Sequence, residues 1–496
     1  MNVLQLGAEN WALKYSIPDQ ITWLHNAYPY SKVKKFDLVI LTVGASLTDK
    51  QWQELQWRVD PYNVLYSPLL EEKLSNAGKK FLEYQAAHQI VEDPQSLINQ
   101  LPTKYYKGQS GIRISPTSLL LNEPKVDFLD SGHLHLKIES HNKWQNIGAY
   151  QSNIYIDPFR VIKISYEFKK STNVNLRFRI FIQDEQGDGN PEENYIINFN
   201  NRDEKDLPVE VADVPRFANI NVEVMGSGDL TLGMLHIRWS RQNNGEFLAG
   251  GKRIVDPQTG EDVAYYFNPG DLRPPLNVYF SGARGLEGFE AYPLFRRNHT
   301  PALLFTDMRL AIGQFYTGQL IEERIKQVII STLQKLGFNN QQLVMNGISM
   351  GTYPAVKLGA QLSPYAINVA KPTLDLGQVA VRSRLERPDE FDTIFDIDNQ
   401  LVDSLNTKTL ERLDQEFWQL MDKNDLTKTR LYIGYMANDD YDNLAMKRMH
   451  KSSAIKKSLL FVSKGFPGRH NDDPMVVQWF AERLNEINRN FRRGVK

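Results

Sequence analysis

The spacing of hydrophobic residues changes twice along the chain and divides it into three parts. Up to about residue 110, short apolar runs such as 37–44 alternate with helix-like stretches, which is typical of a small α/β domain with parallel strands. From about 125 to 242, apolar and polar residues alternate with a period of two, which predicts a β-sandwich. After a stretch rich in Gly and Pro at 245–275, buried runs and helical patterns return.

We therefore predict an α/β protein with three domains. These are a small Rossmann-like α/β domain at 1–120, a β-sandwich of the carbohydrate-binding type at 125–242, and an α/β-hydrolase-like catalytic domain at 250–496. In the first domain, Thr48 and Gln51 form the pattern of a capping box that opens a helix. Gly7 and Gly44 lie outside any G-x-G-x-x-G pattern, so we interpret them as tight turns rather than a nucleotide site.

The third part contains the sequence Gly347-Ile348-Ser349-Met350-Gly351, which has the G-x-S-x-G pattern of a nucleophile elbow. A strand-like run at 342–345 precedes it, and the stretch from 353 to 359 can continue as a helix. In such an elbow a side chain at either glycine would collide with neighbouring backbone. Ser349 is therefore the candidate nucleophile.

A serine nucleophile needs a histidine base and a carboxylate that orients the base. In the α/β-hydrolase order the acid follows the serine and the histidine comes last. Asp439 and Asp440 follow one strand-like run, and His470 follows the next. The sequence does not separate Asp439 from Asp440, and Asp442 is a weaker third choice. His450 is a rival base, but it lies in a helix-like stretch.

The second requirement of acyl chemistry is an oxyanion hole. The backbone N–H of Met350, directly after the nucleophile, is one expected donor. A glycine-rich loop at 281–290 follows an early strand, where this architecture supplies the second donor. We expect that donor in the segment Ala283–Arg284.

Composition excludes several classes of function. The 58 basic and 59 acidic residues balance, which gives no reason to expect nucleic acid or an anionic membrane as the main partner. Since there is no cysteine, disulfides and thiolate metal sites are excluded. The N-terminus lacks the pattern of a secretory signal, and no apolar run approaches the roughly 20 residues of a membrane span. We expect a cytoplasmic protein.

Three groups of side chains resemble metal sites, and we interpret each of them otherwise. His133 and His135 share one strand face without an evident third ligand, so we expect solvated histidines. The oxygen-rich stretch 184–190 lacks the closing glutamate of a calcium loop and is interpreted as a hairpin turn. The aspartates of an acidic helical insertion at 386–427 are expected on a solvated face: Asp392, Asp396 and Asp398. We predict no metal and no tightly bound cofactor.

The elbow, the Asp439-Asp440-Tyr441-Asp442 segment and the Gly468-Arg469-His470 segment, in this domain order, resemble the accessory Sec system acetyltransferases of Gram-positive bacteria. The resemblance covers essentially the full length and is most specific at 276–475. It implies O-acetylation of N-acetylglucosamine on serine-rich-repeat glycoprotein adhesins, with Ser349 as nucleophile and His470 as base. It also implies that the protein acts together with two sister accessory secretory proteins and the accessory Sec motor ATPase. By the same resemblance it is a cytoplasmic protein that can lie at the inner face of the membrane.

Two alternatives remain open at this stage. A carbohydrate esterase would use the same triad with water as the acceptor, and a non-catalytic export scaffold would not use the triad at all. The acetyl donor is also open, with acetyl-CoA as one candidate.

Overall fold

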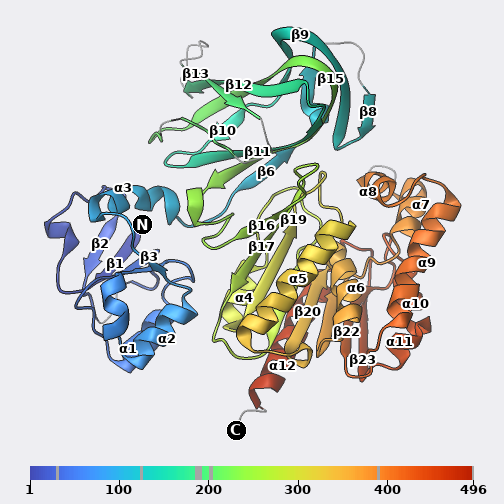
Figure 1. The fold of residues 1–496 in the computed structure, drawn as a ribbon. Coiled ribbons are helices and arrows are strands. Elements are labelled where there is room, and N and C mark those ends of the chain that lie inside the picture. Colours follow the sequence, from blue (N-terminus) through green and yellow to red (C-terminus); the bar gives the residue numbers. More distant parts are fainter. Residues whose placement is uncertain are drawn as a thin grey trace.

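The computed structural model describes residues 1–28, 33–122, 127–184, 193–199, 205–209, 211–387, 391 and 393–493. Three β-sheets follow one another along the chain, and Figure 1 shows the second of them lying above the third with the first to the side. The protein is thus a mixed α/β structure. Within the described residues, every helix is too short or too polar to cross a bilayer.

The first sheet is parallel and has the strand order β2-β1-β3-β4-β5. Its strands are β1 (Asn2–Leu6), β2 (Thr22–His25), β3 (Leu38–Leu41), β4 (Val64–Tyr66) and β5 (His88–Gln89). Helices α1 (Asp49–Gln56) and α2 (Asn76–Tyr84) pack on one face, and α3 (Pro94–Lys104) packs on the other. All four residues of β3 are buried, as expected for a central strand covered on both faces. The predicted capping box opens α1: Gln51 N–H donates to Thr48 Oγ1, and Thr48 N–H donates to Gln51 Oε1.

The second sheet is antiparallel and contains ten strands. They are β6 (Gly111–Ile114), β7 (Leu119–Leu121), β8 (Asp127–Asp130), β9 (His133–Tyr150), β10 (Ile154–Ile156), β11 (Val161–Lys170), β12 (Val174–Asp184), β13 (Glu193–Asn198), β14 (Lys205–Asp206) and β15 (Arg216–Ser240). Strand β15 pairs with β6, β9, β10, β11 and β12 and joins all ten strands around one core. The strands β6 and β7 lie within the predicted first domain but belong to this sheet.

The segments 218–224 and 230–237 belong to one continuous strand, β15. Between them, β15 keeps its pairing with β9 through register shifts at Gly226 and Ser227. Gly226 has φ +109°, and a Cβ there would lie 1.9 Å from the carbonyl oxygen of Asn173. The glycine therefore allows the strand to bend past a neighbour instead of turning back.

The third sheet has eight strands in the order β16-β17-β19-β18-β20-β21-β22-β23. The strands are β16 (Lys252–Val255), β17 (Asp262–Asn268), β18 (Leu276–Phe280), β19 (Ala302–Asp307), β20 (Leu343–Ile348), β21 (Ala366–Ala370), β22 (Arg430–Met436) and β23 (Leu460–Phe466). The six from β19 to β23 are parallel, while β17 runs antiparallel to its two neighbours. Because the carboxyl ends of the parallel strands meet at one edge, the loops that follow them converge there.

Helices cover both faces of the third sheet. Helices α5 (Gln319–Leu336) and α6 (Thr352–Leu362) contribute to the core on one face, and α4 (Tyr292–Asn298) and α12 (Met475–Arg493) contribute to the core on the other. Five more helices lie beyond α6: α7 (Leu376–Glu386), α8 (Thr393–Leu401), α9 (Thr407–Lys423), α10 (Ala445–Lys451) and α11 (Ser453–Lys456). Helices α8 and α9 lie within the acidic helical insertion that the sequence predicts at 386–427, whereas α7 precedes it.

The aspartates of that insertion are not on a solvated face. Asp398 is completely buried, and Asp396 accepts a hydrogen bond from Ser131 in the turn between β8 and β9. Asp392 lies outside the described residues. Burial, together with the nearby Asp414 carboxylate, raises the pKa of Asp398 to about 8. The expected solvated face is therefore wrong, because helix α8 turns Asp398 toward the core.

A buried network of charges joins the second sheet to the third. Arg238 of β15 donates to Asp262 at 2.9 Å and to Glu287 at 2.6 Å, and His236 lies 2.6 Å from Glu287. All four side chains are fully buried. Removing one partner of such a network leaves an uncompensated buried charge, which is strongly destabilising. The two sheets therefore form one structural unit at this contact.

Candidate active site

Ser349 lies at a sharp turn between β20 and α6. Its φ of 54° is in the left-handed region, which is unfavourable for a residue with a Cβ. A Cβ on Gly347 would lie 2.1 Å from the Gly351 carbonyl oxygen, and a Cβ on Gly351 would lie 2.0 Å from that of Phe280. Only glycine fits at either position, so the predicted elbow geometry is present. Local strain of this kind persists where the surrounding structure holds it in place.

His470 contacts the serine directly. It follows β23 through a short loop, and its Nε2 lies 2.9 Å from Ser349 Oγ. The imidazole is almost completely buried, while Ser349 remains partly accessible. The ring of Tyr441 packs edge-on against the imidazole at 4.3 Å between centroids, which limits its rotation.

The two adjacent aspartates contact different parts of His470. Both carboxylate oxygens of Asp439 approach Nδ1, at 3.1 and 3.0 Å. Asp440 instead accepts a hydrogen bond from the backbone N–H of His470 at 2.9 Å, and its other oxygen lies 3.4 Å from Arg387. Asp439 is therefore the one of the two that meets the imidazole ring.

The weaker candidates lie elsewhere. The buried carboxylate of Asp442 accepts four backbone N–H groups, two of them from Leu374 and Asp375. Asp442 therefore caps the chain at 374–375 and at 444–445 and has no hydrogen bond with His470 in the described structure. His450 lies in α10, and its ring packs against Phe461 of β23.

The loop after β18 passes close to the serine. A Cβ built on Gly282 would lie 3.8 Å from Ser349 Cβ. The N–H of Gly282 donates to Glu290 at 3.1 Å, and the N–H of Arg284 donates to the Ile312 carbonyl at 3.2 Å. Both groups are thus engaged in this structure, whereas no acceptor for the Ala283 N–H is found in the described chain. Met350 begins the turn into α6, where N–H groups lack intrahelical partners.

The second sheet holds this loop in place. Arg113 of β6 donates to the carbonyl oxygens of Arg284 at 2.8 Å and Arg309 at 3.1 Å. In addition, the N–H of Glu287 donates to the Gly111 carbonyl at 2.9 Å. The position of the loop beside Ser349 therefore depends on a strand more than 160 residues earlier in the chain.

Two further side chains near the site were missed by the sequence reasoning. Lys371 directly follows β21, and burial lowers its pKa although the Asp439 carboxylate opposes the shift. Arg387 is buried, with its guanidinium 3.3 Å from the centre of the Tyr441 ring. Lys371 could have been noticed, because it ends a strand at the same edge of the sheet. The position of Arg387 depends on how the insertion folds, which no local pattern reveals.

One group of side chains could hold a metal ion among the described residues, and it is separate from Ser349. His133, Glu167 and Glu261 place one ligand atom each within 4.8 Å of one another. His133 is not solvated as expected, because only 18% of its side chain is exposed and Nδ1 lies 2.8 Å from Asp130. The stretch 184–190, interpreted as a hairpin turn, lies almost entirely outside the described residues.

Comparison with known proteins shows which family model, relatives and solved structures this chain is similar to. Residues 1–493 match the family model described as the accessory Sec system GspB-transporter. An accessory Sec system protein of Staphylococcus aureus is 34% identical over 91% of this chain and 87% of the relative. One of Streptococcus gordonii is 31% identical over 97% and 96%. Among solved structures, a chain of the Glycosylation Associate Protein (Gap123) complex from Streptococcus agalactiae is 28% identical, covers 98% of both chains and superposes with a TM-score of 0.86.

Proposed function

Since the chain belongs to the family of accessory Sec system GspB-transporters, we propose that it is a serine-dependent O-acetyltransferase within that export system. Its substrate is N-acetylglucosamine on serine-rich-repeat glycoprotein adhesins. The observation that carries the catalytic proposal is the continuous hydrogen-bonded chain from Ser349 through His470 to Asp439, at an elbow with a left-handed serine. This is an α/β-hydrolase-like arrangement of nucleophile, base and acid.

In the first half-reaction, Ser349 Oγ attacks the carbonyl carbon of an acetyl donor while His470 Nε2 takes the hydroxyl proton. Asp439 keeps the Nδ1–H tautomer and stabilises the imidazolium that forms. The N–H groups of Met350 and Ala283 stabilise the tetrahedral oxyanion. Collapse of the intermediate leaves acetyl-Ser349 and releases the donor's leaving group, which takes the proton from His470.

In the second half-reaction, a sugar hydroxyl attacks the acetyl-serine and gives its proton to His470. As the bond between the acetyl carbon and Ser349 Oγ breaks, His470 returns the proton to Oγ, and the products are the acetylated sugar and the free Ser349 hydroxyl. Water in place of the sugar would make the same site an esterase, because the residues act identically in both cases. The donor is an activated acetyl compound, and acetyl-CoA is a candidate.

The proposed partners follow from the family. The matching Streptococcus agalactiae chain belongs to a complex, so we place this chain beside two sister accessory secretory proteins. They would present the adhesin to the accessory Sec motor ATPase from the cytoplasmic side of the membrane. A purely non-catalytic scaffold would have no use for the strained backbone at Ser349.

Mass spectrometry of the adhesin glycan tests the enzyme assignment. Cells with the wild-type protein are expected to carry O-acetyl groups on N-acetylglucosamine, and cells with Ser349→Ala are expected to lack them. Ser363→Ala is the matched control, since Ser363 also has a positive φ and caps the other end of the same helix. Retained acetylation in the Ser349→Ala cells would exclude Ser349 as nucleophile.

A second measurement separates transferase from esterase. The purified protein is incubated with an acetyl donor, with and without an N-acetylglucosamine acceptor. A transferase forms acetylated sugar and releases little acetate, whereas an esterase releases acetate at the same rate in both reactions.

A further inference from the structure

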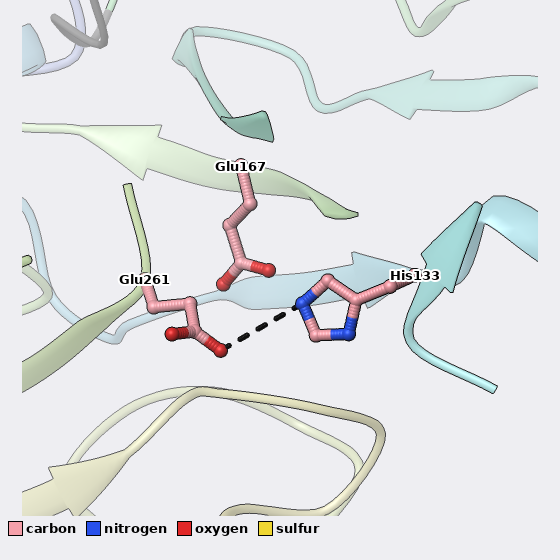
Figure 2. Close-up of side chains that lie close together, drawn as sticks. All are labelled: His133, Glu167 and Glu261. Carbon is pink, nitrogen blue, oxygen red and sulfur yellow. Dashed lines mark ion pairs between the residues drawn. The ribbon is translucent and has the colours of Figure 1, made fainter. Parts of the chain in front are cut away.

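We propose that His133, Glu167 and Glu261 bind a divalent transition-metal ion, of which Zn²⁺ is the best-fitting example, at the contact between the second and third sheets. His133 opens β9, Glu167 lies in β11, and Glu261 directly precedes β17. Figure 2 shows the three side chains converging from three different elements on one point. The site is independent of the acyl chemistry at Ser349.

The separations between the ligand atoms suit a shared ion. The three atoms lie within 4.8 Å of one another, and His133 Nε2 is 3.9 Å from Glu261 Oε1. That distance is too long for a hydrogen bond. Two ligands of one tetrahedral Zn²⁺, each about 2.0–2.1 Å from the metal, lie about 3.4 Å apart. A contraction of roughly half an ångström would therefore bring the pair to bonding positions.

Glu261 supplies an independent indication that a cation binds here. Its Oε1 is buried and has no hydrogen-bond partner, although it points toward His133. The other oxygen, Oε2, accepts a hydrogen bond from Thr259 at 3.0 Å. A buried carboxylate oxygen without a partner carries a desolvation cost, and a bound ion removes that cost.

The neighbours of the cluster orient its members as they do around protein-bound metals. The carboxylate of Asp130 lies 2.8 Å from His133 Nδ1, and a hydrogen bond at Nδ1 directs Nε2 toward the cluster, where an ion can replace its proton. Glu167 is held by the backbone N–H of Met234 at 2.9 Å and by His236 at 3.0 Å. Since a carboxylate oxygen has two lone pairs, these bonds leave Glu167 able to coordinate.

Arg309, whose positive charge acts on Glu261, does not bind its unpartnered oxygen. The guanidinium of Arg309 donates to both oxygens of Asp307, at 2.9 and 2.7 Å, and to the Thr317 carbonyl at 2.7 Å. Its hydrogen bonds are therefore directed away from Glu261, although its charge still acts on that carboxylate. A protonated His133 can balance part of the negative charge, but it does not reach the unpartnered oxygen.

The donor set indicates the class of ion. One imidazole nitrogen with two carboxylates suits Zn²⁺ or a similar ion, whereas Ca²⁺ and Mg²⁺ prefer an all-oxygen shell. The three protein ligands leave a fourth position for water. Two ligands come from the second sheet and one comes from the edge of the third. The ion would therefore cross-link the two sheets and stabilise the contact between them.

Calorimetric titration of the full-length protein with ZnCl₂, after dialysis against a chelator, tests the site. We expect one ion per chain for the wild-type protein, and affinity at least about tenfold lower for His133→Ala and Glu261→Gln. The matched control is His135→Ala, two residues along the same strand and face, which should bind like the wild type. Circular dichroism verifies that the variants are folded.

X-ray absorption of the wild-type Zn²⁺ complex decides the question even if the variants do not fold. Nitrogen and oxygen neighbours at about 2.0–2.2 Å, including a histidine signature, are expected. The proposal fails if the wild-type protein takes up no stoichiometric Zn²⁺, if His135→Ala weakens binding as much as His133→Ala, or if the spectrum lacks the histidine.

Discussion

At the scale of single residues, Asp439 and Asp440 show how neighbours with the same side chain come to have different roles. Asp439 approaches the imidazole nitrogen, whereas Asp440 holds the histidine backbone and pairs with Arg387. No pattern in the sequence distinguishes them, because the distinction depends on which carboxylate the turn after β22 directs toward the loop of His470. The order of serine, acid and histidine nevertheless pointed to the segment that contacts His470.

We predict that Asp439→Asn and Asp440→Asn have very different effects on acetyl transfer. Loss of the Asp439 charge favours the wrong histidine tautomer and is expected to lower kcat on the order of 10⁴-fold. Asp440→Asn keeps an oxygen that can accept from the His470 N–H, so the rate should fall less than about tenfold. Steady-state kinetics of the two purified variants measures this, and equal rates would exclude Asp439 as the orienting acid.

At the scale of elements, sequence patterns predicted those features that depend only on residues close together in the chain. The capping box of α1, the central strand β3 and the strand-turn-helix around Ser349 are all found. The continuity of β15 was missed, because it depends on pairing with β9 and not on the glycines alone. The cluster around His133 was missed for a similar reason, since its ligands are spread over more than 120 residues.

The elbow glycines provide a second prediction, which concerns stability. In Gly351→Ala, the new methyl group would lie 2.0 Å from the Phe280 carbonyl oxygen, so we expect a loss of about 1–3 kcal/mol in unfolding free energy. Gly285→Ala is the matched control, because a Cβ there meets nothing within 4 Å. Chemical denaturation of both variants measures the difference, and equal midpoints would contradict the steric argument.

Helix α8 provides a third prediction, which concerns pH. Because burial raises the pKa of Asp398 to about 8, the folded protein keeps this proton between about pH 4 and pH 8, while the unfolded chain loses it. The contribution of this group to the free energy of unfolding is therefore fully present at low pH. It declines as the pH rises through that window, by up to about 1.4 kcal/mol per pH unit. In Asp398→Asn the group no longer titrates. The melting temperature of the variant minus that of the wild type should therefore be larger at pH 8 than at pH 5.

Thermal unfolding of wild type and variant at both pH values tests this effect. The control is Asp403→Asn, an exposed position just beyond the same helix. If the two variants show the same dependence on pH, Asp398 does not keep its proton in the folded protein.

At the scale of the whole molecule, catalysis and export should be separable. His470 is buried and Ser349 is only partly exposed, so they contribute little outer surface, whereas a stable protein contact needs on the order of 1,000 Å². We therefore expect Ser349→Ala cells to export adhesin with unacetylated glycan, while cells without the gene fail to export it. Secreted adhesin and pull-down of the sister proteins measure the two functions. Loss of binding in the serine variant would mean that the active site and the docking surface coincide.

The anchoring of the loop beside Ser349 by β6 also has a consequence for synthesis on the ribosome. Arg113 emerges 171 residues before Arg284, whose carbonyl it finally holds. At about 5–20 residues per second, translation needs roughly ten to thirty seconds to cover that interval. Until β15 emerges, β6 also lacks its strand partner, so its backbone groups are open to pairing with other chains. The nascent chain is most exposed to misassembly before β15 emerges, and the contact of Arg113 with the loop forms only after β18 of the third sheet has been made.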